Sequence, residues 1–197
     1  MKRLFGLLLA LVFFAGFALA QSPDVTADPV TSEINERKVA YARSSADYFM
    51  DSLDEVMREE LVRSVLSEND EVILAKLLYG EDRENALYMR AAIIWCVFNR
   101  MDAGHLSVEK VVTHSQFPGY LVGNPVKSWA VDLVRDVAIR YVLELNGFSS
   151  VGRVLPKEYL YYEQPIGKRY HVFKTRLKLN DSVHWDWSLP SPYPSDR

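Results

Sequence analysis

Apolar residues recur at helical spacing along the middle of the chain and concentrate in three runs. The first, residues 72–81, is apolar except for Lys76 until it ends at the acidic residue Glu81. The second, residues 86–101, is apolar on nearly all sides, which is typical of a buried central helix. The third, residues 125–145, is followed by Asn146-Gly147. The pattern predicts three long helices that share one core.

Residues that favour helix ends mark where these helices are expected to begin. Asn69 or Asp70 is expected to cap the first helix, and Asn85 the second. For the third helix we expect Asn124 as the N-cap, with Pro125 at the first helical position.

The regions on either side of these helices have different patterns. Residues 32–66 are highly charged, with apolar positions that predict one or two amphipathic helices. Residues 159–162 and 170–173 are aromatic and favour strands, which predicts a small hairpin. We therefore expect an α+β fold that is mainly α, with its main domain at 67–180 and an irregular aromatic and proline-rich tail at 181–197.

The first residues have the pattern of a secretory signal peptide. Lys2-Arg3 precedes an uncharged apolar stretch at 4–17, and Ala18-Leu19-Ala20 fits a cleavage site. A retained anchor is the alternative, but a bilayer span needs about 20 apolar residues. We expect cleavage after Ala20, a linker at 21–31, a secreted or periplasmic location in the cell envelope, and no stable membrane insertion afterwards.

Charge and cysteine content narrow the classes of function. The chain has 23 basic and 26 acidic residues, and loss of residues 1–20 lowers its formal charge from −3 to −5. An acidic chain does not offer the basic surface that nucleic acids require, and it has no polybasic membrane patch. Cys96 is the only cysteine, so no intramolecular disulfide forms, and its apolar surroundings favour a core position. The four histidines are scattered without a metal-binding motif, so no metal or cofactor is expected.

Glu81 is the strongest candidate for chemistry. A carboxyl group at the end of a core helix suits general acid catalysis, because apolar surroundings disfavour the charged form. The alternative is a solvent-exposed residue beside Asp82, Arg83 and Glu84.

Polar and aromatic residues elsewhere complete a possible carbohydrate site. Aromatic walls with a few hydrogen-bonding groups suit sugar rings, which have apolar faces and polar rims. The alternatives are structural: an asparagine that caps a helix, tyrosines that pack a hairpin, and a half-buried histidine on a strand. The candidates are Asn99, Gln116, Tyr161, Tyr162 and His171.

Six short segments occur in an order that is informative. They are Leu77-Leu78-Tyr79-Gly80-Glu81, Ala91-Ala92-Ile93-Ile94 leading into Asn99-Arg100, Val111-Val112, Gln116-Phe117, residues 159–162 and His171-Val172-Phe173. Together they resemble the catalytic domain of the SleB-type cell wall hydrolases, which include spore-cortex-lytic enzymes. Glu81 and Asn99 are eighteen positions apart, as is usual in that family. The chain departs from the family at Glu84, where a glycine is common, and at Asn85, where a second acid is common.

The resemblance implies a lysozyme-like fold and cleavage of the β-1,4 bond between N-acetylmuramic acid and N-acetylglucosamine in peptidoglycan. It implies Glu81 as catalytic acid and base, and Asn99, Gln116, Tyr162 and His171 as substrate-binding residues. A lytic transglycosylase fits one carboxyl group better than a hydrolase, because ordinary glycosidases use two. The alternatives are a non-catalytic secreted domain that binds glycan or a protein partner, and a helical structural protein with coincidental matches.

Overall fold

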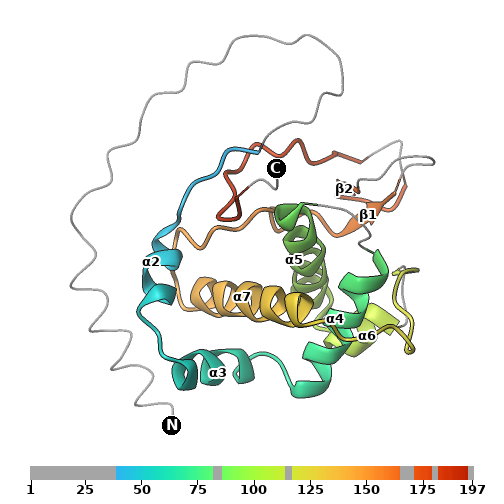
Figure 1. The fold of residues 1–197 in the computed structure, drawn as a ribbon. Coiled ribbons are helices and arrows are strands. Elements are labelled where there is room, and N and C mark those ends of the chain that lie inside the picture. Colours follow the sequence, from blue (N-terminus) through green and yellow to red (C-terminus); the bar gives the residue numbers. More distant parts are fainter. Residues whose placement is uncertain (1–38, 82–85, 114–116, 165–170, 179–181, 195–197) are drawn as a thin grey trace, which may run out of the picture. The chain divides into compact units, whose positions relative to one another are not determined.

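The computed structural model describes residues 39–81, 86–113, 117–164, 171–178 and 182–194. These residues lie in one compact unit, Glu36–Arg197 (Figure 1). Within the described ranges the unit contains six helices and one two-stranded antiparallel sheet, so the predicted mainly helical α+β class is confirmed. The elements are α2 (Ser45–Asp51), α3 (Glu55–Arg63), α4 (Glu68–Glu81), α5 (Leu87–Gly104), α6 (Val108–Thr113), α7 (Ser128–Leu145), β1 (Tyr161–Glu163) and β2 (Val172–Lys174).

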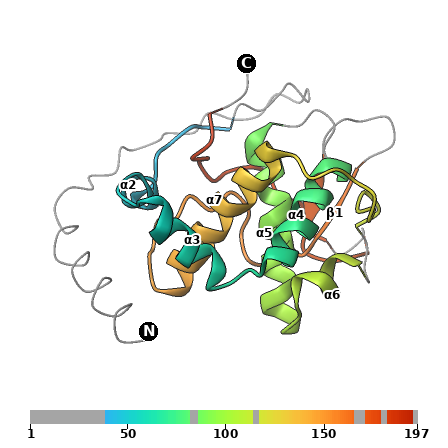
Figure 2. The ribbon, with the colours of Figure 1, turned by 60° about the horizontal axis from the view of Figure 1, so that its bottom comes forward.

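Helix α7 runs through the middle of this unit in both ribbon views (Figures 1 and 2). It packs against α3, α4 and α5, and α6 packs against α4 and α5. Helix α5 supplies the centre of the core, because residues 91–98 are all 0 % exposed. Phe98 of α5 stacks on Tyr141 of α7 with ring centroids 4.6 Å apart. The expectation that α5 is the buried central helix is confirmed.

The N-terminal ends of three helices differ from the sequence expectation. Helix α5 has Ala86 at its N-cap, not Asn85. Helix α4 is capped by Ser67, whose Oγ accepts from Asp70 N at 3.1 Å while Asp70 Oδ2 accepts from Ser67 N at 3.0 Å. This reciprocal pair is a capping box, so neither Asn69 nor Asp70 is the N-cap. Helix α7 begins at Ser128, with Lys127 at the N-cap. Asn124 does not cap this helix, because its side chain turns toward α4.

The predicted hairpin is present near the C-terminus. Strands β1 and β2 pair antiparallel, with Tyr162 opposite Phe173. The tail packs beside it, with the ring of Trp187 at 5.6 Å from that of Phe173. Further along, Ser191 exchanges backbone hydrogen bonds with the first described segment, from Ser191 N to Ala40 O at 2.8 Å and from Ala42 N to Ser191 O at 2.9 Å. The irregular tail is therefore part of the compact unit.

Candidate functional site

Glu81 is the last residue of α4, and two other segments meet at it. Its side chain is half-buried, and Oε1 accepts a hydrogen bond from Gly119 N at 2.7 Å. Its backbone carbonyl lies 3.0 Å from Nε2 of His171, just before β2. Because a carbonyl oxygen only accepts, Nε2 carries the proton in this contact. Positions 38 and 90 residues away in sequence are thus held at one helix end.

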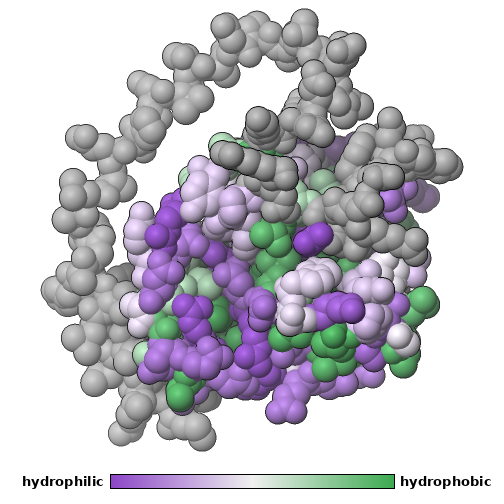
Figure 3. Space-filling view, viewed as in Figure 1, coloured by the Kyte–Doolittle hydropathy of each residue, from purple (hydrophilic) through white to green (hydrophobic). Residues whose placement is uncertain are grey.

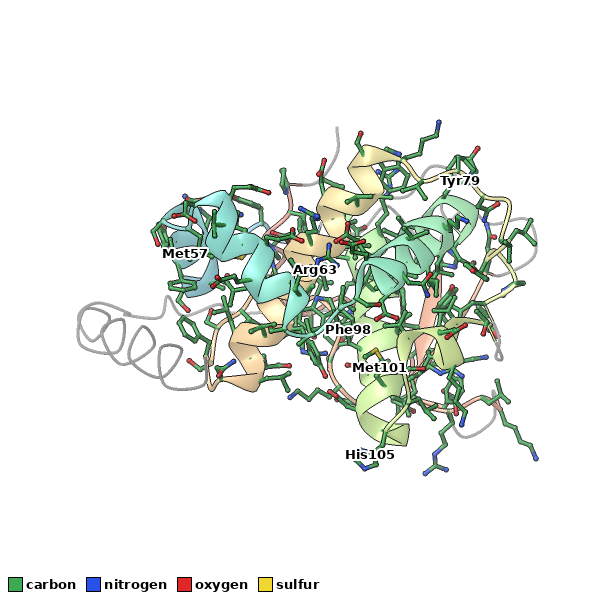
Figure 4. All side chains as sticks on the ribbon, turned by 90° about the horizontal axis from the view of Figure 1, so that it is seen from below. Met57, Arg63, Tyr79, Phe98, Met101 and His105 are labelled. Atoms are coloured by element: carbon green, nitrogen blue, oxygen red, sulfur yellow. The ribbon has the colours of Figure 1, made fainter. Side chains whose placement is uncertain are left out.

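Glu71, a second carboxylate on α4, has a structural role that contrasts with the position of Glu81. Glu71 is buried, and its Oε2 accepts from Arg63 at 2.8 Å and from Arg135 at 3.1 Å. This cluster joins α3, α4 and α7, and Figure 4 shows Arg63 on the side of α3 that faces the other helices. In contrast to Glu71, Glu81 has a backbone amide rather than an arginine on its Oε1.

The loop that carries Gly119 packs closely against the C-terminal end of α4. A Cβ atom on Gly80 would lie 1.6 Å from the carbonyl oxygen of Gly119, and one on Gly119 would lie 2.7 Å from Cδ of Glu81. Asn124 secures this crossing, because its Nδ2 donates to Lys76 O at 3.1 Å and to Gly119 O at 2.8 Å. Glycine at both positions allows the loop to come close enough for the Gly119–Glu81 hydrogen bond.

Tyr162 on β1 belongs to the same site. Its ring lies 4.8 Å from that of His171 and 5.5 Å from that of Phe117, measured between centroids. Burial raises the pKa of Tyr162 well above its ordinary value, and the nearby Glu81 carboxylate adds to this effect. Tyr162 therefore keeps its proton and is a hydrogen-bond donor next to Glu81.

Two buried polar atoms at this site make no hydrogen bond of ordinary geometry within the described residues, although the first of them interacts with the Glu81 side chain. They are the hydroxyl of Tyr162 and Nδ1 of His171. Buried polar atoms in native structures are nearly always paired, so each unpaired one requires an explanation. Here both belong to rings that contact each other beside Glu81, so one buried donor and one buried acceptor lie together at this helix end.

Asn99 has a different position from the other candidates. It is 2 % exposed, its Nδ2 donates to Pro156 O at 2.8 Å and Tyr159 O at 3.0 Å, and its Oδ1 accepts from Arg153 at 2.7 Å. Both amide protons are therefore used within the protein. Asn99 fixes the segment that leads into β1, and a direct contact with substrate stays a prediction.

The neighbouring Arg100 links the two aromatic parts of the site. Its guanidinium carbon lies 5.2 Å from the ring centroid of Phe117 and 5.4 Å from that of Tyr161. These distances are within the range of cation–π contacts. Arg100 therefore connects the start of the Gly119 loop to β1.

The structure thus brings Tyr162 and His171 to Glu81, whereas the hydrogen bonds of Asn99 go to Pro156, Tyr159 and Arg153. Gln116 lies outside the described residues, as do Glu84 and Asn85. Sequence reasoning missed the contribution of Gly119 and Asn124. Pro118-Gly119 and Asn124-Pro125 are turn signals, which predict a loop but not the helix against which it packs.

Three further features of the described part of the chain concern metal binding, Cys96 and membrane spans. No group of three or more histidine, cysteine, aspartate or glutamate side chains there could hold a metal ion. Cys96 is buried, and burial raises the pKa of its thiol to about 12, which agrees with a core position. None of the described helices is both long enough and apolar enough to cross a lipid bilayer.

No family model, curated protein or solved structure matches this chain. Arguments about its function therefore depend on the residues gathered around Glu81.

Proposed function

We propose that the protein is a secreted enzyme that cleaves peptidoglycan glycan strands at the β-1,4 bond between N-acetylmuramic acid and N-acetylglucosamine, as a lytic transglycosylase. The observation that carries this proposal is the half-buried carboxyl group of Glu81, which accepts from Gly119 N at 2.7 Å and interacts with the buried Tyr162 hydroxyl. The resemblance to SleB-type hydrolases supports the same function and a lysozyme-like arrangement of the helices.

Glu81 would act first as an acid and then as a base. Its protonated carboxyl group gives a proton to the glycosidic oxygen as the bond to C1 of the muramic acid breaks. The C6 hydroxyl of the same sugar then attacks C1, and Glu81 takes the hydroxyl proton, which restores the acid and leaves a 1,6-anhydro ring. The hydrogen bond from Gly119 N stabilises the carboxylate between the two steps, because bonds to an ionised acceptor are stronger than bonds to a neutral one.

The residues around Glu81 have supporting roles in this proposal. The Tyr162 hydroxyl would donate to a sugar oxygen or an acetamido carbonyl, and Nδ1 of His171 would accept from a sugar hydroxyl or amide. His171 also fixes the helix end through its contact with the Glu81 carbonyl. Gln116 stays a predicted substrate-binding residue. Asn99 would act indirectly, through the segment that it holds.

A non-catalytic domain that binds glycan is the second candidate. It is favoured by Glu84 and Asn85, which stand where the resembling family commonly has a glycine and a second acid. Digestion of purified peptidoglycan followed by mass spectrometry separates the possibilities. Anhydro-muramoyl ends support the transglycosylase, ordinary reducing ends indicate a hydrolase, and binding without products supports the second candidate.

A further inference from the structure

The loop between α6 and α7 presents apolar side chains to solvent. In residues 120–127, which we name the 120–127 loop, Leu121 is 62 % exposed and Val122 is 75 % exposed. Val126 is also exposed, as is Tyr79 at the neighbouring end of α4. Figure 3 shows apolar surface at the right-hand edge of the molecule, where Figure 1 places this loop, and Figure 4 shows Tyr79 at the outer end of α4.

The shape of this loop is fixed by hydrogen bonds rather than by apolar packing of its tip. Asn124 N donates to Leu121 O at 2.9 Å, which closes a tight turn. Lys76 Nζ donates to Val122 O at 2.6 Å, and Asn124 Nδ2 donates to Gly119 O at 2.8 Å. The loop therefore holds two large aliphatic side chains outward, although burying them would be favourable.

The same hydrogen bonds satisfy three backbone carbonyl groups at the tip, which lowers the cost of moving them into an apolar medium. The carbonyl oxygens of Gly119, Leu121 and Val122 each accept a bond from within the protein. Moving a backbone polar group into hydrocarbon costs several kcal/mol when it lacks a partner, and these carbonyls would keep theirs. A sugar or peptide ligand would instead be recognised through polar groups left open for it, which these carbonyls are not.

Charge around the loop differs from charge elsewhere in the chain. No aspartate or glutamate occurs between Glu109 and Asp132, although the chain has 26 acidic residues. Lys127 lies next to the exposed ring of Tyr79, with Nζ 6.0 Å from the ring centroid. Tyrosine is favoured where membrane meets water, and lysine beside it attracts anionic headgroups.

We propose that the 120–127 loop, together with Tyr79, docks the protein onto an anionic lipid surface by shallow insertion of Leu121 and Val122. Peripheral docking of this kind needs neither a membrane-spanning helix nor a polybasic patch, because Leu121 and Val122 supply apolar insertion and Lys127 adds one favourable charge. It would hold the Glu81 site beside the membrane, because Asn124 and Lys76 fix the loop to α4 within two turns of Glu81. The proposal does not depend on the reaction at Glu81.

Vesicle flotation tests the proposal directly. The chain is purified without residues 1–20, whose apolar run would itself bind lipid, and which lie outside the compact unit Glu36–Arg197. Vesicles of phosphatidylcholine with one quarter phosphatidylglycerol are compared with pure phosphatidylcholine. We expect binding to the anionic vesicles, and about a tenfold weaker partition coefficient for each of Leu121→Gln and Val122→Gln.

The matched control is Val56→Gln. Val56 is also an exposed aliphatic residue, but it lies on α3, which is distant from the loop in both ribbon views (Figures 1 and 2). This variant is expected to bind vesicles like the parent chain. The proposal is wrong if the parent does not bind anionic vesicles, or if the Leu121 and Val122 variants bind them equally well. The proposal is also wrong if the Leu121 and Val122 variants bind anionic vesicles like the parent but bind peptidoglycan more weakly. The loop would then be a glycan-binding surface.

Insertion of the loop tip can be measured separately from binding. Leu121→Cys is labelled with an environment-sensitive dye, and Cys96 does not compete because it is buried. We expect the emission of the dye to shift to the blue on anionic vesicles, while the same dye on Val56→Cys does not shift. Equal responses from both positions would show that the tip does not insert.

Discussion

The backbone of Gly80 lies directly against the backbone of Gly119, and this contact places an amide on the carboxyl group of Glu81. A Cβ on Gly80 would lie 1.6 Å from the Gly119 carbonyl oxygen and 2.6 Å from Nδ2 of Asn124. The end of α4 and the loop therefore fit together only while position 80 has no side chain.

Gly80→Ala tests this contact. Alanine in a helix normally stabilises by roughly 0.5–1 kcal/mol relative to glycine, but here the methyl group would push the loop away. We expect a loss of about 1–3 kcal/mol of unfolding free energy, as in other overpacked sites, together with reduced glycan cleavage. Denaturant unfolding and a glycan-release assay measure both.

Gly123→Ala is the control for this substitution. A Cβ at Gly123 meets nothing within 4 Å, so stability and activity are expected to stay close to those of the parent. If Gly80→Ala behaves like Gly123→Ala, the close approach of the two backbones is not required.

Tyr162→Phe removes the buried hydroxyl, which makes no hydrogen bond of ordinary geometry within the described residues although it interacts with Glu81. An unsatisfied buried hydroxyl costs about 1–3 kcal/mol, so we expect the variant to be as stable as the parent or more stable. Glycan cleavage should nevertheless fall, because a donor beside Glu81 is lost. Melting curves and kcat/KM are measured together. A clear loss of stability would indicate that the hydroxyl has a structural role instead.

Asn99→Ala is expected to affect folding. It leaves the carbonyl groups of Pro156 and Tyr159 and one arm of Arg153 without their present partner, so we expect a loss of at least about 2 kcal/mol. Asn146→Ala is the comparison, because Asn146 is exposed and donates one bond to Val142 O at 2.8 Å. Its expected loss is about 0.5 kcal/mol. Equal effects in urea unfolding would contradict the positioning role of Asn99.

The stability of the protein should fall in acid partly through Glu144. Burial alone raises the pKa of Glu144, but the hydrogen bond and charge of Arg153, with Lys157, outweigh it, so the pKa in the folded protein is lowered. A carboxyl group whose pKa is lower in the folded than in the unfolded protein stabilises the fold above the unfolded pKa. This stabilisation is lost as the pH falls through the folded pKa. Urea unfolding from pH 7 to pH 3 should show that the parent loses its advantage over Glu144→Gln below about pH 4. A constant difference at all pH values would rule out this contribution.

Hydrophobic periodicity was sufficient to predict the helices and the core, because helix–helix packing requires an apolar face at regular spacing. It identified α5 as central, and residues 91–98 are fully buried. The caps were less predictable. Asn69 and Ser67 both suit an N-cap, and the choice depends on the reciprocal bonds between Ser67 and Asp70. Asn124 has a competing tertiary partner in the end of α4.

The candidate site was predictable only in part. Glu81, Tyr162 and His171 were selected by residue chemistry and by resemblance, and the structure brings them together. The hydrogen bond from Gly119 to Glu81 spans 38 positions and depends on two glycines with no periodic signal. The hydrogen bonds of Asn99 to Pro156, Tyr159 and Arg153 were not predictable, because an amide that binds sugar and an amide that holds a loop look the same in sequence.

The most direct test of the proposed function is Glu81→Gln compared with Glu84→Gln. Glutamine is nearly isosteric and can still accept the bond from Gly119 N, but it has no ionisable proton to give. Glu84 stands where the resembling family commonly has a glycine, so no catalytic role is inferred for it. With matched melting curves, we predict that Glu81→Gln lowers release of soluble glycan from peptidoglycan by about 10²–10⁴-fold or more, while Glu84→Gln stays close to the parent. Near-parental activity of Glu81→Gln, or loss of activity in Glu84→Gln alone, would contradict the assignment.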